Sequence, residues 1–325
     1  MEQFTISILG AKVTYISSVP LLNYFIKNKE YMEFYDAKIV SKVKRLTDDD
    51  YVIVYYNIKD KSCPIKINGN KMIINYPFEE LNESIILYLA SHFLEKQFGQ
   101  MGICSCHSAC VTKDGNATLI LGDAGAGKTS LAYKLCQSRG YKLISNDMTL
   151  IGMSSDKIIA FAGTKFINLR LLSVKQNMPE LLPLFNNDNI DGWINKISVI
   201  ARDIGIEEEY NPTIIENIIY LRIDNREKLI ISNGDSWRNN FLLYQNTSSH
   251  IRGSAATFIN KKGYPIGYIP PMETQETYKK RVELLNAINK NKNYKYVVGP
   301  LEDIIEYIDS LYKLQNGKVK KYEKK

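Results

Sequence analysis

The segment Gly122-Asp-Ala-Gly-Ala-Gly-Lys128-Thr129 constrains the fold of this 325-residue chain more than any other feature. It fits the pattern G-x-x-x-x-G-K-[ST], between a short apolar run, Ala117–Leu121, and a helical pattern, Lys128–Ser138, that Gly140 closes. Small residues let such a loop wrap closely, so that its backbone N–H groups and the start of the helix favour phosphate oxygens. The pattern predicts a strand–loop–helix unit that binds a nucleoside triphosphate.

Individual residues of this motif carry separate tasks. Lys128 can reach the β- and γ-phosphates, and the Thr129 hydroxyl can contact Mg²⁺. We therefore predict ATP and Mg²⁺ as cofactors, although no motif that would distinguish adenine from guanine is present. The residues predicted to bind the nucleotide are Gly122, Asp123, Ala124, Gly125, Ala126, Gly127, Lys128, Thr129 and Ser130.

A second strand, predicted over Tyr141–Ser145, is followed by Asn146 and Asp147. Strands and helices alternating at this density suggest a βαβ unit on a largely parallel sheet, and hence an α/β fold. If this strand is adjacent to the loop strand, its carboxyl end lies in the ligand crevice beside the loop. A carboxylate there can accept a hydroxyl proton, orient a nucleophile or help hold the metal. Asp147 is equally compatible with an ordinary turn or N-cap residue.

The remaining patterns predict three regions along the chain. Residues 1–98 indicate a small α+β domain, residues 99–312 the domain with the loop, and residues 313–325 a basic tail. Within 172–216 the pattern is poorly periodic, which favours inserted helices and loops. The other predicted elements are strands at Phe4–Leu9, Lys12–Ile16, Tyr51–Tyr56, Lys71–Tyr76 and Ile215–Ile223, a hairpin at Asn68–Gly69, and helices at 77–98, Glu276–Asn289 and Leu301–Leu314.

Charge and composition exclude several classes of partner. Of the net charge of +7, the tail from Lys313 to Lys325 carries +5, so the chain before it carries about +2 and does not imply nucleic acid. The tail is either a solvated, frayed end or a segment that attracts an acidic partner. No apolar run approaches the ~18 residues that span a bilayer, and the first residues lack a secretory signal. With five cysteines, these features predict a cytoplasmic protein with reduced thiols and no membrane partner.

Three of the cysteines cluster with a histidine in Cys104-Ser-Cys106-His107-Ser-Ala-Cys110. Four soft ligands within seven residues would suit zinc, but a second ligand pair at finger spacing is missing. On an alternating strand, His107 would also point away from Cys104 and Cys106. We therefore interpret the cysteines as reduced core thiols.

His107, the glycine loop, Arg139-Gly140 and the run LISND together resemble the core of HPr kinase/phosphorylase. This family is a serine kinase of the phosphoenolpyruvate-carboxykinase-like P-loop type, in which a histidine precedes the loop lysine by 21 residues, as His107 precedes Lys128 here. The family ending Gly-x-x-Leu-x-x-Asp-Asp appears as Gly140-Tyr-Lys-Leu143-Ile-Ser-Asn146-Asp147. The resemblance is specific over about 105–150, only plausible over 160–270, and absent over the first ninety residues.

The resemblance implies a P-loop kinase core preceded by a small α+β domain, and it implies roles for four residues. Asp147 would take the proton from an acceptor serine, His107 would support that carboxylate, and Lys128 would stabilise the transferring phosphoryl group. Arg252, on a late loop at Ile251–Ala256, is either a further stabiliser of that charge or a surface arginine.

Two departures from the family weaken the implied metal site. Asn146 replaces the first aspartate of the pair, and the family's Glu-Ile-Arg-Gly appears as Asn168-Leu169-Arg170. Because asparagine can still ligate through its carbonyl oxygen, we predict a weaker Mg²⁺ site at Thr129, Asn146 and Asp147. The family motifs for the reverse reaction are not found, so we expect kinase activity only.

The acceptor is implied only by the resemblance. Related peptide kinases, some from lasso-peptide biosynthesis, share this layout, which suggests a kinase for a serine hydroxyl of a peptide or small protein, a lasso-type precursor being one candidate. HPr kinase relatives assemble as oligomers, so the resemblance is compatible with a homo-oligomer.

One alternative to a kinase is a P-loop ATPase, because Ile218–Ile223 followed by Asp224 has the form of a Walker B element. Another is a non-catalytic nucleotide-binding module, suggested by Asn146 and Asn168.

Overall fold

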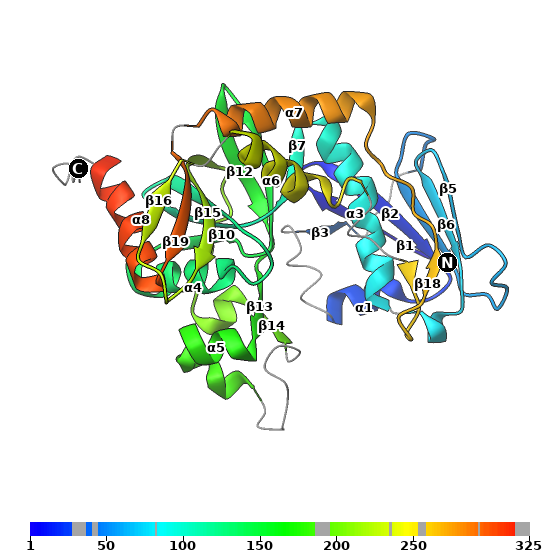
Figure 1. The fold of residues 1–325 in the computed structure, drawn as a ribbon. Helices are drawn as coiled ribbons and strands as arrows, with labels where there is room; N and C mark the ends of the chain where they lie inside the picture. Colours follow the sequence, from blue (N-terminus) through cyan, green and yellow to red (C-terminus); the bar gives the residue numbers. More distant parts are fainter. Residues whose placement is uncertain are drawn as a thin grey trace. The chain divides into compact units, whose positions relative to one another are not determined.

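The computed structural model divides the chain into two compact units with mixed α/β structure (Figure 1). The first unit contains Met1–Cys106, Leu150–Met153 and Leu242–Asn286, and the second contains His107–Thr149, Ser154–Phe241 and Ala287–Lys325. Within the described chain, no helix has both the length and the apolar character needed to cross a bilayer. The structure describes residues 1–27, 37–40, 45–81, 83–185, 196–233, 236–252, 258–291 and 293–315.

A six-stranded sheet with the order β3-β1-β2-β4-β6-β5 forms the centre of the first unit. The predicted hairpin is confirmed, because β5 and β6 pair antiparallel with Asn68 opposite Lys71. The helix predicted over 77–98 is confirmed as α3, which packs against β2. The elements are β1 (Glu2–Ile8), β2 (Ala11–Ser17), α1 (Leu21–Lys27), β3 (Lys38–Val40), β4 (Val52–Tyr56), β5 (Ile65–Asn68), β6 (Lys71–Asn75), η2 (Phe78–Glu80), α3 (Glu83–Gln100), β17 (Phe258–Ile259) and β18 (Pro265–Gly267).

The structural division differs from the predicted boundary between 98 and 99. The first unit reaches Cys106 and also includes residues 242–286, which the sequence pattern places in the loop domain. These residues pack at the end of α3: Lys280 Nζ donates to the Gln100 carbonyl at 2.6 Å, and Thr277 lies against Gly99. Helices α6 (Ser236–Ser248) and α7 (Gln275–Asn289) and strands β7 (Ile103–His107) and β11 (Met148–Ser154) contribute residues to both units.

The second unit is built on a mixed sheet in which β10-β8-β9-β15-β12 are neighbours and β19 joins β15 to β16. Only β9–β15 and β15–β19 are parallel among these pairings, so the prediction of a largely parallel sheet is wrong. Strand β8 lies between the loop strand β9 and β10, which are therefore not adjacent. The strands are β8 (Ala109–Lys113), β9 (Asn116–Leu121), β10 (Lys142–Ser145), β12 (Lys157–Gly163), β15 (Thr213–Ile223), β16 (Ile230–Ser232) and β19 (Tyr294–Gly299).

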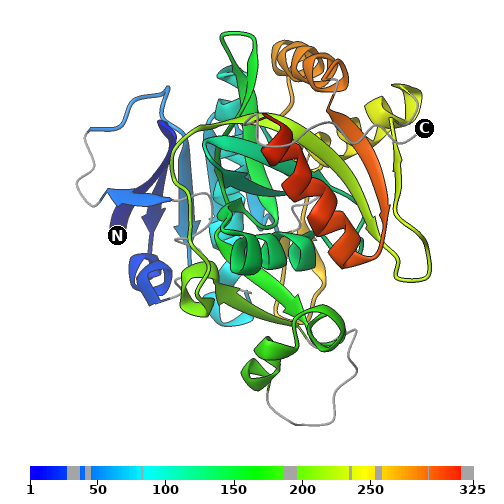
Figure 2. The ribbon, with the colours of Figure 1, turned by 90° about the vertical axis from the view of Figure 1, so that its left-hand side faces the viewer.

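Helices α4 (Lys128–Arg139) and α8 (Leu301–Gln315) lie side by side on one face of this sheet (Figure 2). Apolar residues recur along α8 at helical spacing and face the core, which explains why the pattern predicted this helix. The buried apolar residues of α8 are Leu301, Ile304, Ile305, Ile308 and Tyr312. Lys313 is still helical and pairs with Asp309 at 3.0 Å, so the helix extends into the predicted basic tail, whose residues 316–325 lie outside the described chain.

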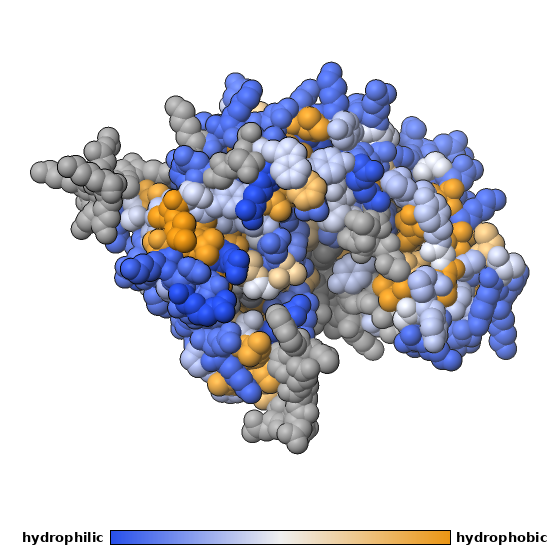
Figure 3. Space-filling model, viewed as in Figure 1, coloured by the Kyte–Doolittle hydropathy of each residue, from blue (hydrophilic) through white to orange (hydrophobic). Residues whose placement is uncertain are grey.

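Residues 172–216 contain more regular structure than predicted. Strands β13 (Phe166–Arg170) and β14 (Lys196–Ile200) form an antiparallel pair beside α5 (Leu171–Asn177), η3 (Pro179–Leu184) and η4 (Ala201–Ile204). The run NNDNIDGW lies within residues 186–195, outside the described chain. Charged and polar side chains dominate the face shown in Figure 3, where an apolar patch lies over β16, whose Ile230 and Ile231 are exposed.

Candidate functional site

The glycine loop connects β9 to α4 as the motif predicts. Gly122 has φ 155° and Gly127 has φ 98°, and a Cβ atom at Gly122 would lie 2.8 Å from the Leu221 carbonyl oxygen. A Cβ atom at Gly127 would collide with the Ile223 side chain, whose backbone N–H donates to the Ala126 carbonyl at 3.0 Å. Strand β15 thus packs directly against the loop, and only glycine fits at these two positions.

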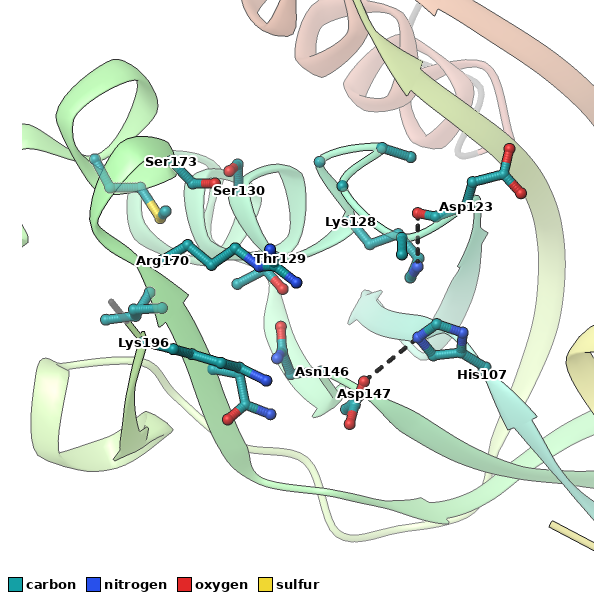
Figure 4. Close-up of a pocket in the computed structure, with 17 residues that line it drawn as sticks. His107, Asp123, Lys128, Thr129, Ser130, Asn146, Asp147, Arg170, Ser173 and Lys196 are labelled. Atoms are coloured by element: carbon teal, nitrogen blue, oxygen red, sulfur yellow. Dashed lines mark hydrogen bonds and ion pairs between the residues drawn. The ribbon is translucent and has the colours of Figure 1, made fainter. Parts of the chain in front are cut away.

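A cavity of about 190 Å³ opens beside the loop, and all its lining residues belong to the second unit. It brings together nearly every residue that the sequence assigned to nucleotide, metal or proton transfer (Figure 4). Gly122 does not line it, but its carbonyl accepts from Lys128 Nζ at 2.7 Å. The lining residues are His107, Asp123, Ala124, Gly125, Ala126, Gly127, Lys128, Thr129, Ser130, Asn146, Asp147, Asn168, Leu169, Arg170, Ser173, Met178 and Lys196.

Asp147 and His107 face one another across the cavity (Figure 4). His107 Nε2 lies 3.5 Å from Asp147 Oδ1, and the two side chains are 38% and 42% exposed. Burial alone would raise the pKa of Asp147, but the hydrogen bond from His107 and the positive charges of His107, Lys196 and Lys128 together lower it below its ordinary value. The carboxylate is therefore ionised at neutral pH, in a cavity that Lys128 and Lys196 also line.

The backbone around Asp147 is fixed by hydrogen bonds from neighbouring segments. The Thr164 hydroxyl accepts from the N–H groups of Asp147 and Met148 at 3.1 and 3.0 Å, and the Asp147 carbonyl accepts from Ser108 N–H at 3.1 Å. Lys165, which is fully buried, donates to the Ile144 carbonyl at 2.6 Å. These contacts hold the carboxyl end of β10 at the cavity although β8 separates it from the loop strand.

Lys128 begins α4 and is 8% exposed. Its Nζ donates to the carbonyls of Gly122 at 2.7 Å and Asp123 at 3.3 Å, so the ammonium group lies within the curve of the loop. The backbone N–H groups at the start of this helix and the lysine charge are features that favour phosphate oxygens.

Asn146 provides an observation that fits a cation. Its side chain is 3% exposed, lines the cavity, and its Oδ1 has no hydrogen-bond partner among the described residues. Figure 4 shows this oxygen directed toward Thr129. A buried carbonyl oxygen without a donor is costly, whereas with the Thr129 hydroxyl and the Asp147 carboxylate it forms the oxygen set that Mg²⁺ prefers.

Two further cations at the cavity come from the paired strands β13 and β14. Arg170 and Lys196 stand directly opposite one another in this pair and line the cavity. Asn168 is less suited to a metal, because its Oδ1 already accepts from Ser198 Oγ at 2.6 Å. In the sequence Arg170 stands out only as part of the Asn168-Leu169-Arg170 motif, and no pattern singles out Lys196, Ser173 or Met178. The alternation of polar and apolar residues in Lys196-Ile-Ser-Val-Ile could have predicted the strand that carries Lys196.

Two residues considered in the sequence analysis do not line this cavity. Arg252 belongs to the first unit, where its Nη1 donates to Tyr244 Oη at 2.6 Å and lies 3.6 Å from Glu273, so its catalytic role stays a prediction. Its neighbours 253–257 are outside the described chain. Asp224 binds Arg226 Nε at 3.0 Å, and hydrogen bonds from that residue lower the pKa of the Asp224 carboxyl to about 2.

The cysteine cluster does not form a metal site. Within the described parts of the chain, no group of three or more histidine, cysteine or acidic side chains is placed to hold a metal ion. Cys104, Cys106 and Cys110 are buried and form no disulfide, while His107, on the same strand as the first two, lines the cavity. The interpretation as core thiols is consistent with this arrangement.

Comparisons with known proteins give a limited similarity. No family model matches the chain. The HPr kinase/phosphorylase of Mycoplasmopsis pulmonis (strain UAB CTIP) is 31% identical over 96 residues, which are 30% of this chain. The chain thus spans about 28% of the length of the curated relative that it matches. The similarity in sequence points to the same family that His107, the loop and Asn146-Asp147 resemble.

Among solved structures, the Hpr(Ser) kinase/phosphatase from Coxiella burnetii matches with a TM-score of 0.31 and 12% identity. That alignment covers 66% of this chain and 97% of the other. A TM-score this low does not establish a common fold.

Proposed function

We propose that this protein is an ATP-dependent kinase that transfers the γ-phosphoryl group to a serine hydroxyl of a peptide or protein. The observation that carries the proposal is the cavity that gathers Asp147, His107 and Lys128 beside a phosphate-binding loop. A nucleotide-binding loop alone would be compatible with many activities. The ionised carboxylate opposite the loop lysine is the feature that suits transfer to a hydroxyl.

In this proposal Asp147 orients the acceptor hydroxyl and takes its proton as the phosphoryl group is transferred. Its lowered pKa keeps it ionised, so it acts more by positioning than as a strong base. His107, 3.5 Å away, holds the orientation of the carboxylate. Both residues are held by segments outside the loop, so the side chains of the proton acceptor and of the phosphate-binding lysine can be changed separately.

The remaining groups would hold the nucleotide and stabilise charge. Lys128 and the loop N–H groups would bind the phosphates, while Arg170 and Lys196 would stabilise charge on the transferred group from the opposite wall. Mg²⁺, if held by Thr129, Asn146 and Asp147, would neutralise phosphate charge. These residues fit such an ion, because Asn146 presents an unpartnered buried oxygen among the described residues.

The test is incubation with γ-labelled ATP and a panel of serine-containing peptides, including a lasso-type precursor with a C-terminal serine. We expect Asp147→Asn to lower transfer by about 10²–10⁴-fold, the usual contribution of a positioned proton acceptor, while ATP affinity changes only a few-fold. Asp203→Asn is a matched control, because Asp203 is exposed and does not line the cavity. Full turnover in Asp147→Asn would refute the assignment.

The same assay separates the alternative functions. Hydrolysis of ATP at the same rate with and without every peptide would favour a P-loop ATPase. Nucleotide binding with neither hydrolysis nor transfer would favour a regulatory module, for which Asn146 and Asn168 in place of carboxylates are the supporting feature. Against the ATPase, Asp224 is bound by arginine and does not line the cavity.

A further inference from the structure

A second cavity, of about 580 Å³, adjoins the glycine loop on another side. It shares the loop residues 123–126 with the first cavity, so the tip of the loop forms a wall of both. All its lining residues belong to the second unit, and apart from the shared loop residues none has a role in the proposed transfer reaction. They are Asp123, Ala124, Gly125, Ala126, Tyr220, Leu221, Arg222, Ile223, Ser232, Arg238, Tyr296 and Val298.

The position of this cavity follows from the three parallel strands. β9, β15 and β19 run parallel to one another, and the cavity is lined by residues near the carboxyl ends of β15 and β19 and by the loop that follows β9. In open α/β sheets, ligands bind in the crevice outside the carboxyl ends of parallel strands. The first cavity lies instead on the side of Asp147, where the terminal phosphate would react.

The side chains of this cavity form a platform for a flat ring. Tyr220 and Tyr296 are buried with ring centroids 5.3 Å apart, and the Arg238 guanidinium lies 5.2 Å from the centroid of Tyr296. Arg238 itself is exposed, on the rim of the cavity. Arginine planes and aromatic rings are the groups on which nucleobases stack.

A hydrogen bond links this platform to the phosphate loop. Tyr220 Oη donates to Asp123 Oδ1 at 2.7 Å, so the aromatic wall and the first residues of the loop are fixed to one another. Because Asp123 accepts this bond and the other charged groups of the cavity are Arg222 and Arg238, the cavity presents mainly hydrogen-bond donors. A base with acceptor atoms on its edge suits such a wall.

We infer that the second cavity binds the purine nucleoside of the triphosphate, with the base stacked on Arg238 and the phosphates crossing the loop into the first cavity. This inference rests on the proposed function, because it assigns the part of the nucleotide that the loop does not hold. Stacking depends on ring area more than on edge atoms, so adenine and guanine are both accepted and pyrimidines bind less well.

The test compares ATP with inorganic tripolyphosphate, which has the phosphates but no nucleoside. We expect the wild-type protein to bind ATP more tightly than tripolyphosphate in calorimetric titrations. Arg238→Ala should weaken ATP binding about tenfold, in the range of one lost stacking contact, and change tripolyphosphate binding less than twofold. Lys128→Ala should weaken both ligands.

Two controls separate stacking from charge and from folding. Arg226→Ala removes an exposed arginine that pairs with Asp224 outside the cavity, and it should leave both affinities unchanged. Arg238→Lys keeps the charge but loses the planar group, so it should bind ATP nearly as weakly as Arg238→Ala. GTP should bind within about tenfold of ATP, and CTP more weakly than both.

Several results would overturn the inference. Wild-type affinity for ATP in Arg238→Ala or in Arg238→Lys would refute the stacking role of Arg238. Equal binding of tripolyphosphate and ATP by the wild-type protein would refute the nucleoside cavity while leaving the triphosphate site intact. Binding of neither ligand would refute the proposed function together with the inference.

Discussion

Asp147 in the second unit and Glu95 in the first are two carboxyl groups whose surroundings act in opposite directions. Asp147 lies in an open cavity among His107, Lys128 and Lys196, and their charges and hydrogen bonding lower its pKa despite burial. Glu95 is 2% exposed on α3, and burial raises its pKa to about 7 although Ser105 hydrogen-bonds to it. No positively charged group contributes to the pKa shift of Glu95, whereas lysines help to lower the pKa of Asp147.

A perturbed carboxyl group therefore marks a functional site only when a cavity and partners accompany it. Burial raises the pKa of Glu95 to about 7, yet this residue lies on α3 with His92, a buried histidine whose pKa burial lowers to about 4. Neither residue lines either of the two cavities described above. A search for shifted pKa values alone would therefore select the core of the first unit rather than the loop site.

The different surroundings of the two carboxyl groups predict a large effect of Glu95 on stability. The folded protein binds the Glu95 proton more tightly than the unfolded chain does, whose glutamate has the ordinary pKa of 4.5. The stability that protonated Glu95 gives is therefore lost as the pH rises from about 4.5 to about 7. We expect Glu95→Gln to stabilise the fold at pH 8 by up to about 3 kcal/mol, and to leave it nearly unchanged near pH 4.5.

Urea denaturation of wild-type protein and Glu95→Gln at a series of pH values measures this difference. His92 titrates over part of the same range with the opposite sign, since its lowered pKa costs stability as the pH falls. Taking the difference between the two proteins at each pH removes that contribution. Serine transfer should stay within twofold in Glu95→Gln. A variant that is less stable at pH 8 would show that Glu95 is ionised and paired in the folded state.

A smaller effect is expected from removing one of the cations around Asp147. Lys196→Met removes a charge that helps to lower the pKa of Asp147, so this pKa rises and the acid limb of the rate profile moves to higher pH. We expect kcat/KM to fall about tenfold at low pH and less at pH 8. This decrease is smaller than the roughly 10²–10³-fold loss of rate that follows when a hydrogen-bond donor to the reacting group is removed. The measurement is kcat/KM for peptide phosphorylation against pH.

Lys157→Met is the matched control, since Lys157 is an exposed lysine of β12 that does not line the cavity. It should leave the whole rate profile unchanged. An Lys196→Met profile that drops by the same factor at every pH would show that Lys196 acts on the phosphoryl group or the acceptor alone, without tuning Asp147.

Much of the local structure could be predicted because it depends on short-range patterns. The hairpin at Asn68–Gly69, the helix α8 and the loop between β9 and α4 all follow from residues that are close in sequence. The strand order could not be predicted in this way. Strand β8 pairs with both β9 and β10, and the first unit includes residues 242–286. Both features depend on packing between residues far apart in the sequence, which local patterns do not reveal.

The candidate site divides along the same line. Lys128, Asp147 and His107 belong to a motif and to spacings that can be read from the sequence, and the cavity contains all three. Lys196 could not be identified, because one exposed lysine at the start of a short alternating strand looks like any surface residue. The second cavity could not be predicted from the sequence either, because β15, β16, α6 and β19 each contribute only a few residues to it.

The smallest expected effect concerns Asp224, a third carboxylate, which follows the apolar strand β15 as a Walker B aspartate would. Hydrogen bonds from Arg226 hold it, and its backbone N–H donates to the Gly299 carbonyl at 2.9 Å. Because Asp224 lines neither cavity and an ion pair with an exposed arginine contributes little, we expect Asp224→Asn to keep ATP turnover and serine transfer within about twofold. The measurement is release and transfer of labelled phosphate by the same preparation.

The opposite outcome would be a loss of turnover as severe as that expected for Asp147→Asn, in a protein that still binds tripolyphosphate. It would mean that Asp224 rather than Asp147 acts at the terminal phosphate. Asp147 and Asp224 would then exchange roles, and the ATPase alternative would account better for the loop.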